Sequence, residues 1–572
     1  MVTTAAAVES MQAVVPETSS LEGRLPLVIG VTGHRHLRQE DLPVLRQRVQ
    51  ELLERLGRRF PATPLRVITA LAAGADRLVA QVALEAGHEL LVPLPLEPRE
   101  YERDFPESVE EFRALLARLP AGCTFVFPGS HATGPDGAVT QADRELRYRD
   151  VGLFIAEQSH LLLALWDGKP SASNAGTAAV VRFKLEGTAG ELESGLRALD
   201  ADDSGPVVHI HTPREGDSEA AAGAVQWLFP QEGEESVFET LAARINQFNS
   251  EPLRHTSAPQ LSEAAAALLG PADFLTESER RLASSFAKAD LLARHYQRLT
   301  KAVLRSTLVF AALLAVAFEI YAEVLPWRGL PAGYLALFAS LTVVLLWQRR
   351  RDVQGRYLDY RALAEGLRVQ FYWRVAGLPD NASGSYLRKQ LDELRWIREA
   401  LRGAASLAHP ERSQPEIALA RWVGGQAAYY ADRAQSQRRR LHAFERSSRL
   451  FMMAGLASAA ALVAFFSRRG AEPSRWHAWL VVLMGFAPIG AALWETYAER
   501  LGLRSQVNQY ARFAGIFRRA GRFAEQLERI RDPDARRQAL DALLRELGHE
   551  ALMENGDWVL LLRERPLVLP KG

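Results

Sequence analysis

The chain has 572 residues, of which 48% are hydrophobic and 24% charged, and its formal net charge at pH 7 is +1. This length predicts two or three domains, and the composition permits a sizeable core and does not suggest disorder. The balanced charge gives no basic field that would indicate nucleic acid as a partner. The single cysteine, Cys123, excludes an intramolecular disulfide and a thiolate metal cluster, and it fits a reducing compartment.

The composition changes along the chain in a way that predicts five segments. Residues 1–24 lack both the basic start and the apolar run of a signal peptide, so we expect a disordered leader. We then expect an α/β ligand-binding domain over 25–250, a linker and a helix leading to the membrane over 251–300, a first membrane hairpin with a cytoplasmic helix over 301–400, and a second such unit over 401–572. The predicted fold class is α/β with a Rossmann-like parallel sheet, followed by an all-α membrane region with four transmembrane helices.

Short apolar runs alternate with helical stretches in the first of these domains. The apolar runs are LPLVIGVTG, LRVITAL, HELLVPLPL, CTFVFPG, HLLLALWDG and PVVHIHTP. Helices are expected over residues 41–59, 74–86, 141–158 and 176–185. Nearly continuous apolar strands that alternate with helices are typical of a parallel sheet covered on both faces.

Glycine and polar residues follow three of these strands, where parallel sheets bind their ligands. Beyond the carboxyl ends of such strands, helix N-termini offer free backbone N–H groups to anions, glycine permits close approach, and arginine matches a phosphate. We therefore predict a site for a nucleotide-derived ligand, and no other cofactor. It comprises Gly30, Thr32, Gly33, His34 and Arg35 after the first strand, Gly74, Asp76 and Arg77 after the second, and Asp167, Gly168, Gly176 and Thr177 after the fifth.

Several of these residues also have a plainer interpretation. His34 is equally compatible with a cap on its turn, and Asp76 with an acidic residue in the first turn of a helix. Glycine and small polar residues are ordinary turn formers, so the prediction depends on the convergence of three strand ends. His209 and His211 share one face of a strand, but no carboxylate or cysteine accompanies them, so no metal site is predicted.

Four apolar runs follow residue 300. A bilayer core about 30 Å thick requires about 20 helical residues, with a lower limit near 17. Tryptophans stand at the ends of the runs, which is typical of the headgroup layer, and the middle of each run carries essentially no charge. The alternative is a pair of hairpins buried in a soluble bundle. The runs are Ser306–Leu325, Leu330–Trp347, Leu450–Phe466 and Trp479–Trp494.

Arginines at the ends of the runs predict the orientation. They precede the first and third runs and follow the second and fourth, so both hairpins are expected to start and end in the cytoplasm. The three arginines of the second hairpin loop, SRRGAEPSR, oppose this assignment. Glu319 and Glu323 lie near the end of the first run, where they either line water or a partner helix, or face solvent at the outer interface.

The segments after the two hairpins look duplicated. Tyr360, Ala364 and Arg368 follow the second run at the same spacing at which Tyr510, Ala514 and Arg518 follow the fourth. Each set places an aromatic, a small residue and a cation on one helical face. This pattern predicts two copies of one unit, each a membrane hairpin with a cytoplasmic helix.

At these motifs the chain resembles two known families. Over about residues 25–215, VTGHR, LAAGAD and WDG…NAGT occur in the order found in the SLOG superfamily, the Rossmann-like domains related to DNA-processing protein A and the lonely-guy proteins. Over about residues 280–570, YLDYRALAEGLRVQFYW and ENGDWVLLLRERPL are similar to the SLATT domain, a two-helix membrane module associated with SLOG domains. The resemblance implies a nucleotide sensor joined to a membrane effector, in the class proposed for bacterial anti-phage systems.

One departure from the family bears on enzymatic activity. The enzymatic members use a PGGxGTxxE motif, whereas this chain has NAGTAAV from Asn174, without the paired glycines and the glutamate. We therefore expect a ligand-gated membrane effector that binds the bilayer and a nucleotide-type molecule and acts as a homo-oligomer at the cell (inner) membrane. One rival is a membrane-tethered nucleotide or NAD hydrolase, with Glu100, Asp104 or Asp143 as general base. The other is a scaffold without a small-molecule ligand.

Overall fold

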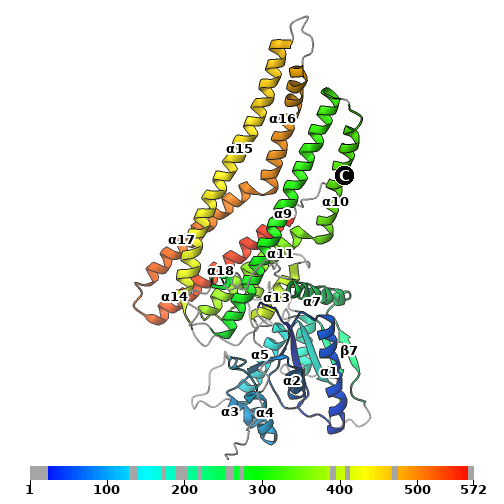
Figure 1. The fold of residues 1–572 in the computed structure, drawn as a ribbon. Helices are drawn as coiled ribbons and strands as arrows, with labels where there is room; N and C mark the ends of the chain where they lie inside the picture. Colours follow the sequence, from blue (N-terminus) through cyan, green and yellow to red (C-terminus); the bar gives the residue numbers. More distant parts are fainter. Residues whose placement is uncertain are drawn as a thin grey trace, which may run out of the picture.

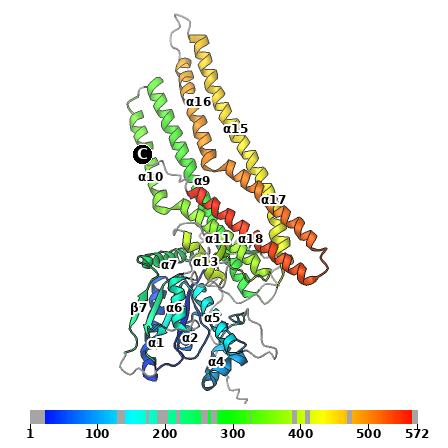
Figure 2. The same cartoon turned by 180° about the vertical axis from the view of Figure 1, so that it is seen from behind.

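The protein consists of an α/β domain and a long helical part that extends away from it (Figures 1 and 2). The computed structural model describes residues 23–127, 140–170, 176–187, 204–214, 221–251, 263–266, 268, 276–325, 327–386, 394–405, 413–466 and 475–563. Most of the predicted leader, residues 1–22, lies outside this range. The two residues that follow belong to the fold, because Gly23 is buried against Ser284 and Lys288.

The α/β domain is built on a seven-stranded sheet with the order β4-β3-β2-β1-β5-β6-β7. All neighbouring strands run parallel except β7, which pairs antiparallel with β6. The predicted fold class is confirmed, and β7 is an additional edge strand. The strands are β1 (Leu27–Gly33), β2 (Leu65–Ile68), β3 (Glu89–Leu94), β4 (Thr124–Val126), β5 (Leu161–Trp166), β6 (Val207–His211) and β7 (Val225–Leu228).

Helices cover both faces of this sheet, as the apolar strands require. In β1, Leu27 and Ile29 pack on the face covered by α1, α2, α4 and α7, whereas Val28 packs on the face of α5 and α6. Alternate side chains of a strand point to opposite faces, so both sides of β1 are buried. The helices of this domain are α1 (Leu42–Arg59), α2 (Ala75–Glu85), α3 (Pro98–Tyr101), α4 (Val109–Ala117), α5 (Gln141–Gln158), α6 (Thr177–Glu186) and α7 (Glu234–Ser250).

The helical part contains the four predicted membrane helices. Of the most apolar window of each helix, between 6% and 22% of the residues are buried inside the molecule. Helices this apolar and this exposed support an integral membrane protein over a soluble bundle. The helices are α9 (Glu277–Glu323), α10 (Leu330–Arg351), α11 (Val353–Val375), α12 (Ala382–Ser385), α13 (Arg395–Ala405), α14 (Pro415–Ile417), α15 (Gly425–Phe466), α16 (Arg475–Arg500), α17 (Leu503–Leu527) and α18 (Pro533–Arg563).

Two units within this part share one architecture. In each, a long helix rises, a second helix returns, and a third turns away below it: α9, α10 and α11, then α15, α16 and α17 (Figure 1). The turn into the third helix is left-handed in both, at Asp352 and at Gly502. These two residues have the same spacing as Tyr360 and Tyr510, which supports the predicted duplication.

The two hairpins touch within the apolar region. A Cβ placed on Gly485 of α16 would lie 2.7 Å from Oε1 of Glu319 on α9, so the glycine makes room for this carboxylate. Glu319 is half-buried, whereas Glu323 is exposed. Each of the two glutamates therefore fits a different one of the predicted alternatives. Glu319 faces a partner helix, and Glu323 lies on the surface.

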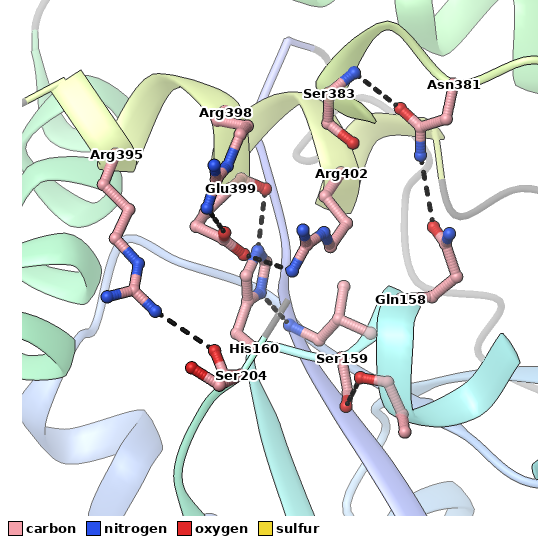
Figure 3. Close-up of polar contacts among 12 residues, drawn as sticks. Gln158, Ser159, His160, Ser204, Asn381, Ser383, Arg395, Arg398, Glu399 and Arg402 are labelled. Carbon is pink, nitrogen blue, oxygen red and sulfur yellow. Dashed lines mark hydrogen bonds and ion pairs between the residues drawn. The ribbon is translucent and has the colours of Figure 1, made fainter. Parts of the chain in front are cut away.

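The amino-terminal edge of the sheet rests on the helical part, chiefly on α13. His160, directly before β5, is buried there: its Nδ1 accepts a hydrogen bond from the Val28 N–H, and its Nε2 lies 2.8 Å from the carbonyl oxygen of Glu399. Figure 3 shows α13 facing His160 and Ser204, with Arg395 donating to the Ser204 carbonyl at 3.1 Å. The carboxyl edge of the sheet therefore points away from the membrane helices.

Candidate functional site

A cavity of about 690 Å³ lies at the carboxyl edge of the sheet. It opens beside β1 and β5, which are neighbours in the sheet although β2, β3 and β4 lie between them in the chain. The strand order reverses at this pair, and such switch points leave a crevice where doubly wound sheets bind ligands. The parallel register pairs Gly33 with Leu165, which brings the loops after both strands to the same level.

Seven of the twelve predicted site residues line this cavity. They come from all three predicted strand ends, so the expected convergence on one edge is present. Of the other five, Gly30 lies deeper in β1 against Ser159, and Gly74, Arg77, Asp167 and Gly168 are outside the lining. The seven are Thr32, Gly33, His34, Arg35, Asp76, Gly176 and Thr177.

Gly33 and Gly74 shape the wall of the cavity through close backbone contact. A Cβ on Gly33 would lie 2.4 Å from the Cβ of Ala75, and one on Gly74 would lie 2.3 Å from the carbonyl oxygen of Arg35. Gly74 also has a φ of +83°, which favours glycine. The Ala75 N–H donates to the His34 carbonyl at 3.0 Å, so the loop after β1 is fixed to the start of α2.

His34 and Asp167 connect the ends of β1 and β5. The backbone N–H of Asp167 donates to Nε2 of His34 at 3.0 Å, and Oδ2 of Asp167 accepts from Nε of Arg214 at 2.7 Å. Burial lowers the pKa of His34, although the Asp167 charge opposes this effect. A neutral His34 with its Nε2 accepting holds the two loops together. Asp167 is buried below the cavity, and Gly168 continues its turn at a φ of +74°.

Arg35 is an exposed cation of the lining. Its guanidinium lies 5.0 Å from the ring centroid of Tyr148 on α5, and no carboxylate in the described part of the chain lies within ion-pair distance of it. A guanidinium in this position retains donors for a phosphate. Arg77 behaves differently, because it is fully buried and donates to Leu71, Ser108 and Glu111. It stabilises the packing of α2 on α4 and lies outside the lining.

A stripe of α5 contributes lining residues that the sequence prediction missed. Gln141, Arg144 and Tyr148 all face the cavity, at the spacing of one helical face. That spacing was visible in the sequence, but nothing linked α5 to the strand ends. Arg144 donates to Asp104 at 2.9 Å and also pairs with Glu100.

The carboxylates suggested for a hydrolase are engaged in structural contacts. Glu100 and Asp104 both pair with Arg144, and Asp104 also accepts from the Tyr148 hydroxyl. Asp143 forms a capping box with Thr140 at the start of α5. All three carboxylates are thus engaged by neighbouring side chains or by a helix N-terminus.

Helix α6 presents an uncapped N-terminus to the cavity. Its N-cap, Gly176, makes no side-chain cap hydrogen bond, and Gly176 and Thr177 both line the cavity. The first backbone N–H groups of a helix attract anions. The preceding residues Ser173, Asn174 and Ala175 lie outside the described residues.

Asp76 is a buried carboxyl in the lining. Burial raises its pKa to about 6, although the Thr69 hydroxyl, the Ala72 N–H and the charges of Arg35 and Arg77 oppose this rise. The residue therefore changes charge close to neutral pH. In either protonation state, its carboxyl group is able to form a hydrogen bond with a hydroxyl group.

Asp76→Asn is expected to raise the apparent free energy of unfolding by about 2 kcal/mol at pH 8. The native carboxyl keeps its proton up to about pH 6, whereas the unfolded one releases it near 3.8. The native state thus binds more protons in this window, and stability falls as pH rises through it. Thermal unfolding of the full chain in detergent at pH 4 and pH 8 measures the effect. Glu145→Gln, an exposed lining carboxylate, is the control, and an equal gain there would contradict the prediction.

Comparison with protein-family models, curated proteins and solved structures found no match. A function for the protein is therefore inferred from the geometry of this cavity.

Within the described residues, no group of three or more histidine, cysteine, aspartate or glutamate side chains is arranged to hold a metal ion. His209 lies near Trp166, with its Nε2 3.0 Å from that carbonyl oxygen.

Proposed function

We propose that this protein is a ligand-gated membrane effector in which a phosphate-bearing nucleotide derivative binds the cavity at the carboxyl edge of the sheet. The observation that carries the proposal is the placement of Arg35, Asp76 and the α6 N-terminus around one cavity at the strand switch point. Arg35 and the α6 backbone bind phosphate, and Asp76 accepts or donates to a ribose hydroxyl. An ADP-ribose or a cyclic nucleotide has this combination of groups.

Coupling to the membrane requires a route through the sheet. Strand β5 begins directly after His160, which contacts α13, and ends at Trp166 in the cavity lining. A ligand that draws the loops after β1 and β5 together acts on the strand that carries the domain contact. It shifts the membrane helices only if it binds one arrangement of the contact more tightly than the other.

The membrane helices are the effector in this proposal. The arginine-rich helix ends support an orientation in which the α/β domain and the C-terminus are cytoplasmic, and a location in the inner membrane is part of this proposal. Four helices per chain leave little room for a wide pore, so assembly into a homo-oligomer is expected before the hairpins open a pore or disrupt the bilayer. The resemblance to SLOG and SLATT domains suggests bacterial anti-phage or conflict signalling as the setting.

The membrane-tethered hydrolase remains a second candidate because of Asp76, a buried carboxyl in the cavity whose pKa is raised to about 6. A carboxyl that titrates near neutral pH is suited to general acid–base chemistry. Recovery of the ligand distinguishes the two functions. A sensor returns it intact, and a hydrolase returns it cleaved.

Arg35→Ala is expected to weaken ligand binding at least about tenfold, the loss of about 1.4 kcal/mol from one charge-assisted contact. The full chain, reconstituted in liposomes, is incubated with ADP-ribose and with cyclic nucleotides, and thermal shift, recovered ligand and dye leakage are recorded together. Arg103→Ala, an exposed arginine outside the lining, is the control. Binding and leakage that survive Arg35→Ala would overturn this site. An unchanged wild-type protein with every probe would favour the scaffold.

A further inference from the structure

A second and larger cavity, of about 1500 Å³, lies between the two membrane units on the side of the α/β domain. Helices α9 and α11 of the first unit, α15 and α17 of the second, and α18 contribute to its wall. It shares no lining residue with the cavity at the sheet. It lies close below the membrane helices, because Arg351, the last residue of α10, is part of its lining.

The lining is strongly basic. Eight arginines face four carboxylates, which leaves a surplus of four positive charges. Arginine keeps its charge under all ordinary conditions, so the surplus cannot be removed by loss of protons. A wall of this composition therefore favours an anionic occupant.

Asp290 and Glu365, two of the four carboxylates of this cavity, already pair with neighbouring arginines. Asp290 pairs with Arg294 at 2.6 Å and with Arg361 at 3.3 Å. Glu365 pairs with Arg368 at 2.8 Å and also lies 3.6 Å from Arg361. Both carboxylates are buried. Their negative charge is therefore neutralised by arginines of α9 and α11.

Three other arginines of the lining, one on α9 and two in or before α15, have no such partner in the described part of the chain. In the described part of the chain, no carboxylate lies within ion-pair distance of Arg298, Arg421 or Arg433, whereas Arg433 lies 5.2 Å from the ring of Tyr429. In addition, Nε of Arg368 is buried without a hydrogen-bond partner. These donors remain available to a ligand.

Local structure fixes one of these arginines in the wall. Arg421 belongs to a π-helical segment, Ala418–Gly424, that precedes α15. The next residue, Trp422, is buried and stacks on Tyr372 of α11, with ring centroids 5.4 Å apart and an interplanar angle of 4°. π-Helical segments are rare and frequently mark functional sites. Here the segment anchors Trp422 in the core and leaves Arg421 exposed at the cavity.

We infer that this cavity binds a phosphate group, with Arg421 and Arg433 as direct contacts. The planar guanidinium forms paired hydrogen bonds to phosphate, and several uncompensated arginines favour a group with more than one negative charge. Two sources supply such a group below membrane helices: the headgroup of an anionic lipid and a free phosphate compound. Occupancy would join the two membrane units through charges of opposite sign, independently of any nucleotide at the sheet.

The test uses the full chain carrying Arg35→Ala, so that the cavity at the sheet does not supply the response. In one arm, nanodiscs of phosphatidylcholine alone receive inorganic pyrophosphate. In the other, the nanodiscs contain phosphatidylglycerol and no free phosphate. Thermal shift and native mass spectrometry report binding. A response in the first arm identifies a soluble phosphate, and a response confined to the second identifies a lipid headgroup.

Arg421→Ala with Arg433→Ala is expected to reduce the affinity for the responding probe at least tenfold. The matched control is Arg518→Ala with Arg519→Ala, which removes the same charge from exposed positions of α17 outside the cavity. Arg518 is also the counterpart of Arg368 in the second unit by its spacing. The inference is overturned if neither probe binds the parent protein, or if the two double variants bind equally well.

Discussion

Replacing His160 with alanine is expected to lower the apparent free energy of unfolding by about 3–5 kcal/mol and to loosen α13 from the sheet. The imidazole is 4% exposed and spans the contact between the two parts (Figure 3). Its removal leaves the Val28 N–H and the Glu399 carbonyl buried without these partners and opens a void between them. Hydrogen exchange should therefore speed up in α13, while thermal unfolding in detergent moves to lower temperature.

A second substitution separates the two halves of this contact. The side-chain oxygen of asparagine takes the position of Nδ1, so His160→Asn keeps an acceptor for the Val28 N–H and loses the link to Glu399. It is expected to release α13 while leaving the sheet largely stable. Equal exchange in α13 for the parent protein, His160→Ala and His160→Asn would contradict a role for His160 in joining the two parts.

The same histidine gives the contact a pH dependence. Burial lowers the pKa of His160 to about 4 from 6.5, although the Glu399 charge opposes this. Between these values the unfolded chain binds more protons than the native one. The contribution of His160 to the free energy of unfolding therefore rises with pH through this window. It is fully present above pH 6.5 and is lost as the pH falls toward 4. The parent protein should lose up to about 3 kcal/mol relative to His160→Asn across it. The parent protein has to be compared with His160→Asn because the titration of Asp76 changes the stability of both proteins in the opposite direction.

Gly74→Ala is expected to lower the apparent free energy of unfolding by about 3–5 kcal/mol and to abolish ligand binding at the sheet. The new Cβ would lie 2.3 Å from the Arg35 carbonyl oxygen and 2.5 Å from that of His34. Both neighbours are backbone atoms, so the loop after β1 has to move. Because this loop carries His34 and Arg35, the cavity loses its shape together with its stability.

Gly87 offers a matched control for this substitution. It follows the other end of α2 and has a similar φ of +75°, but nothing lies within 4 Å of its added Cβ. Gly87→Ala is expected to cost only the backbone strain of about 1–2 kcal/mol and to leave ligand binding unchanged. Thermal unfolding and ligand titration on both variants test the comparison. Similar losses at the two positions would show that strain alone, without the contact at Arg35, explains the effect.

The fold was largely predictable because its patterns are local. Six strand segments were found from their apolar runs, and α5 begins and ends where the sequence predicted. Strand β7 was missed because its first two residues are exposed and its run is short. The position of α13 was also missed. This helix crosses the expected boundary at residue 400, and its role depends on His160, which is distant in the sequence.

The site was predictable only in part. Strand ends of a parallel sheet meet at one edge, so Gly33, Arg35 and Asp76 were found from the sequence. Tyr148 was not, because its place beside Arg35 depends on how α5 packs across the sheet. Arg77 was assigned to the site for its charge and position, but helical rotation directs it to α4. The basic cavity between the membrane units depends on packing between distant helices, which no local pattern specifies.

Helix α9 is long enough to convert a small rotation at its base into a large displacement of its far end. It runs unbroken for 47 residues from Glu277, near the base of the sheet, to Glu323 at the far end of the apolar region. At about 1.5 Å per residue its length is roughly 70 Å, so a tilt of about 5° at its base displaces its far end by about 6 Å. Near that base, Arg281 contacts Glu89 at the start of β3. A movement of the sheet too small to disturb its own hydrogen bonds would thus be magnified to the scale of a helix turn across the bilayer.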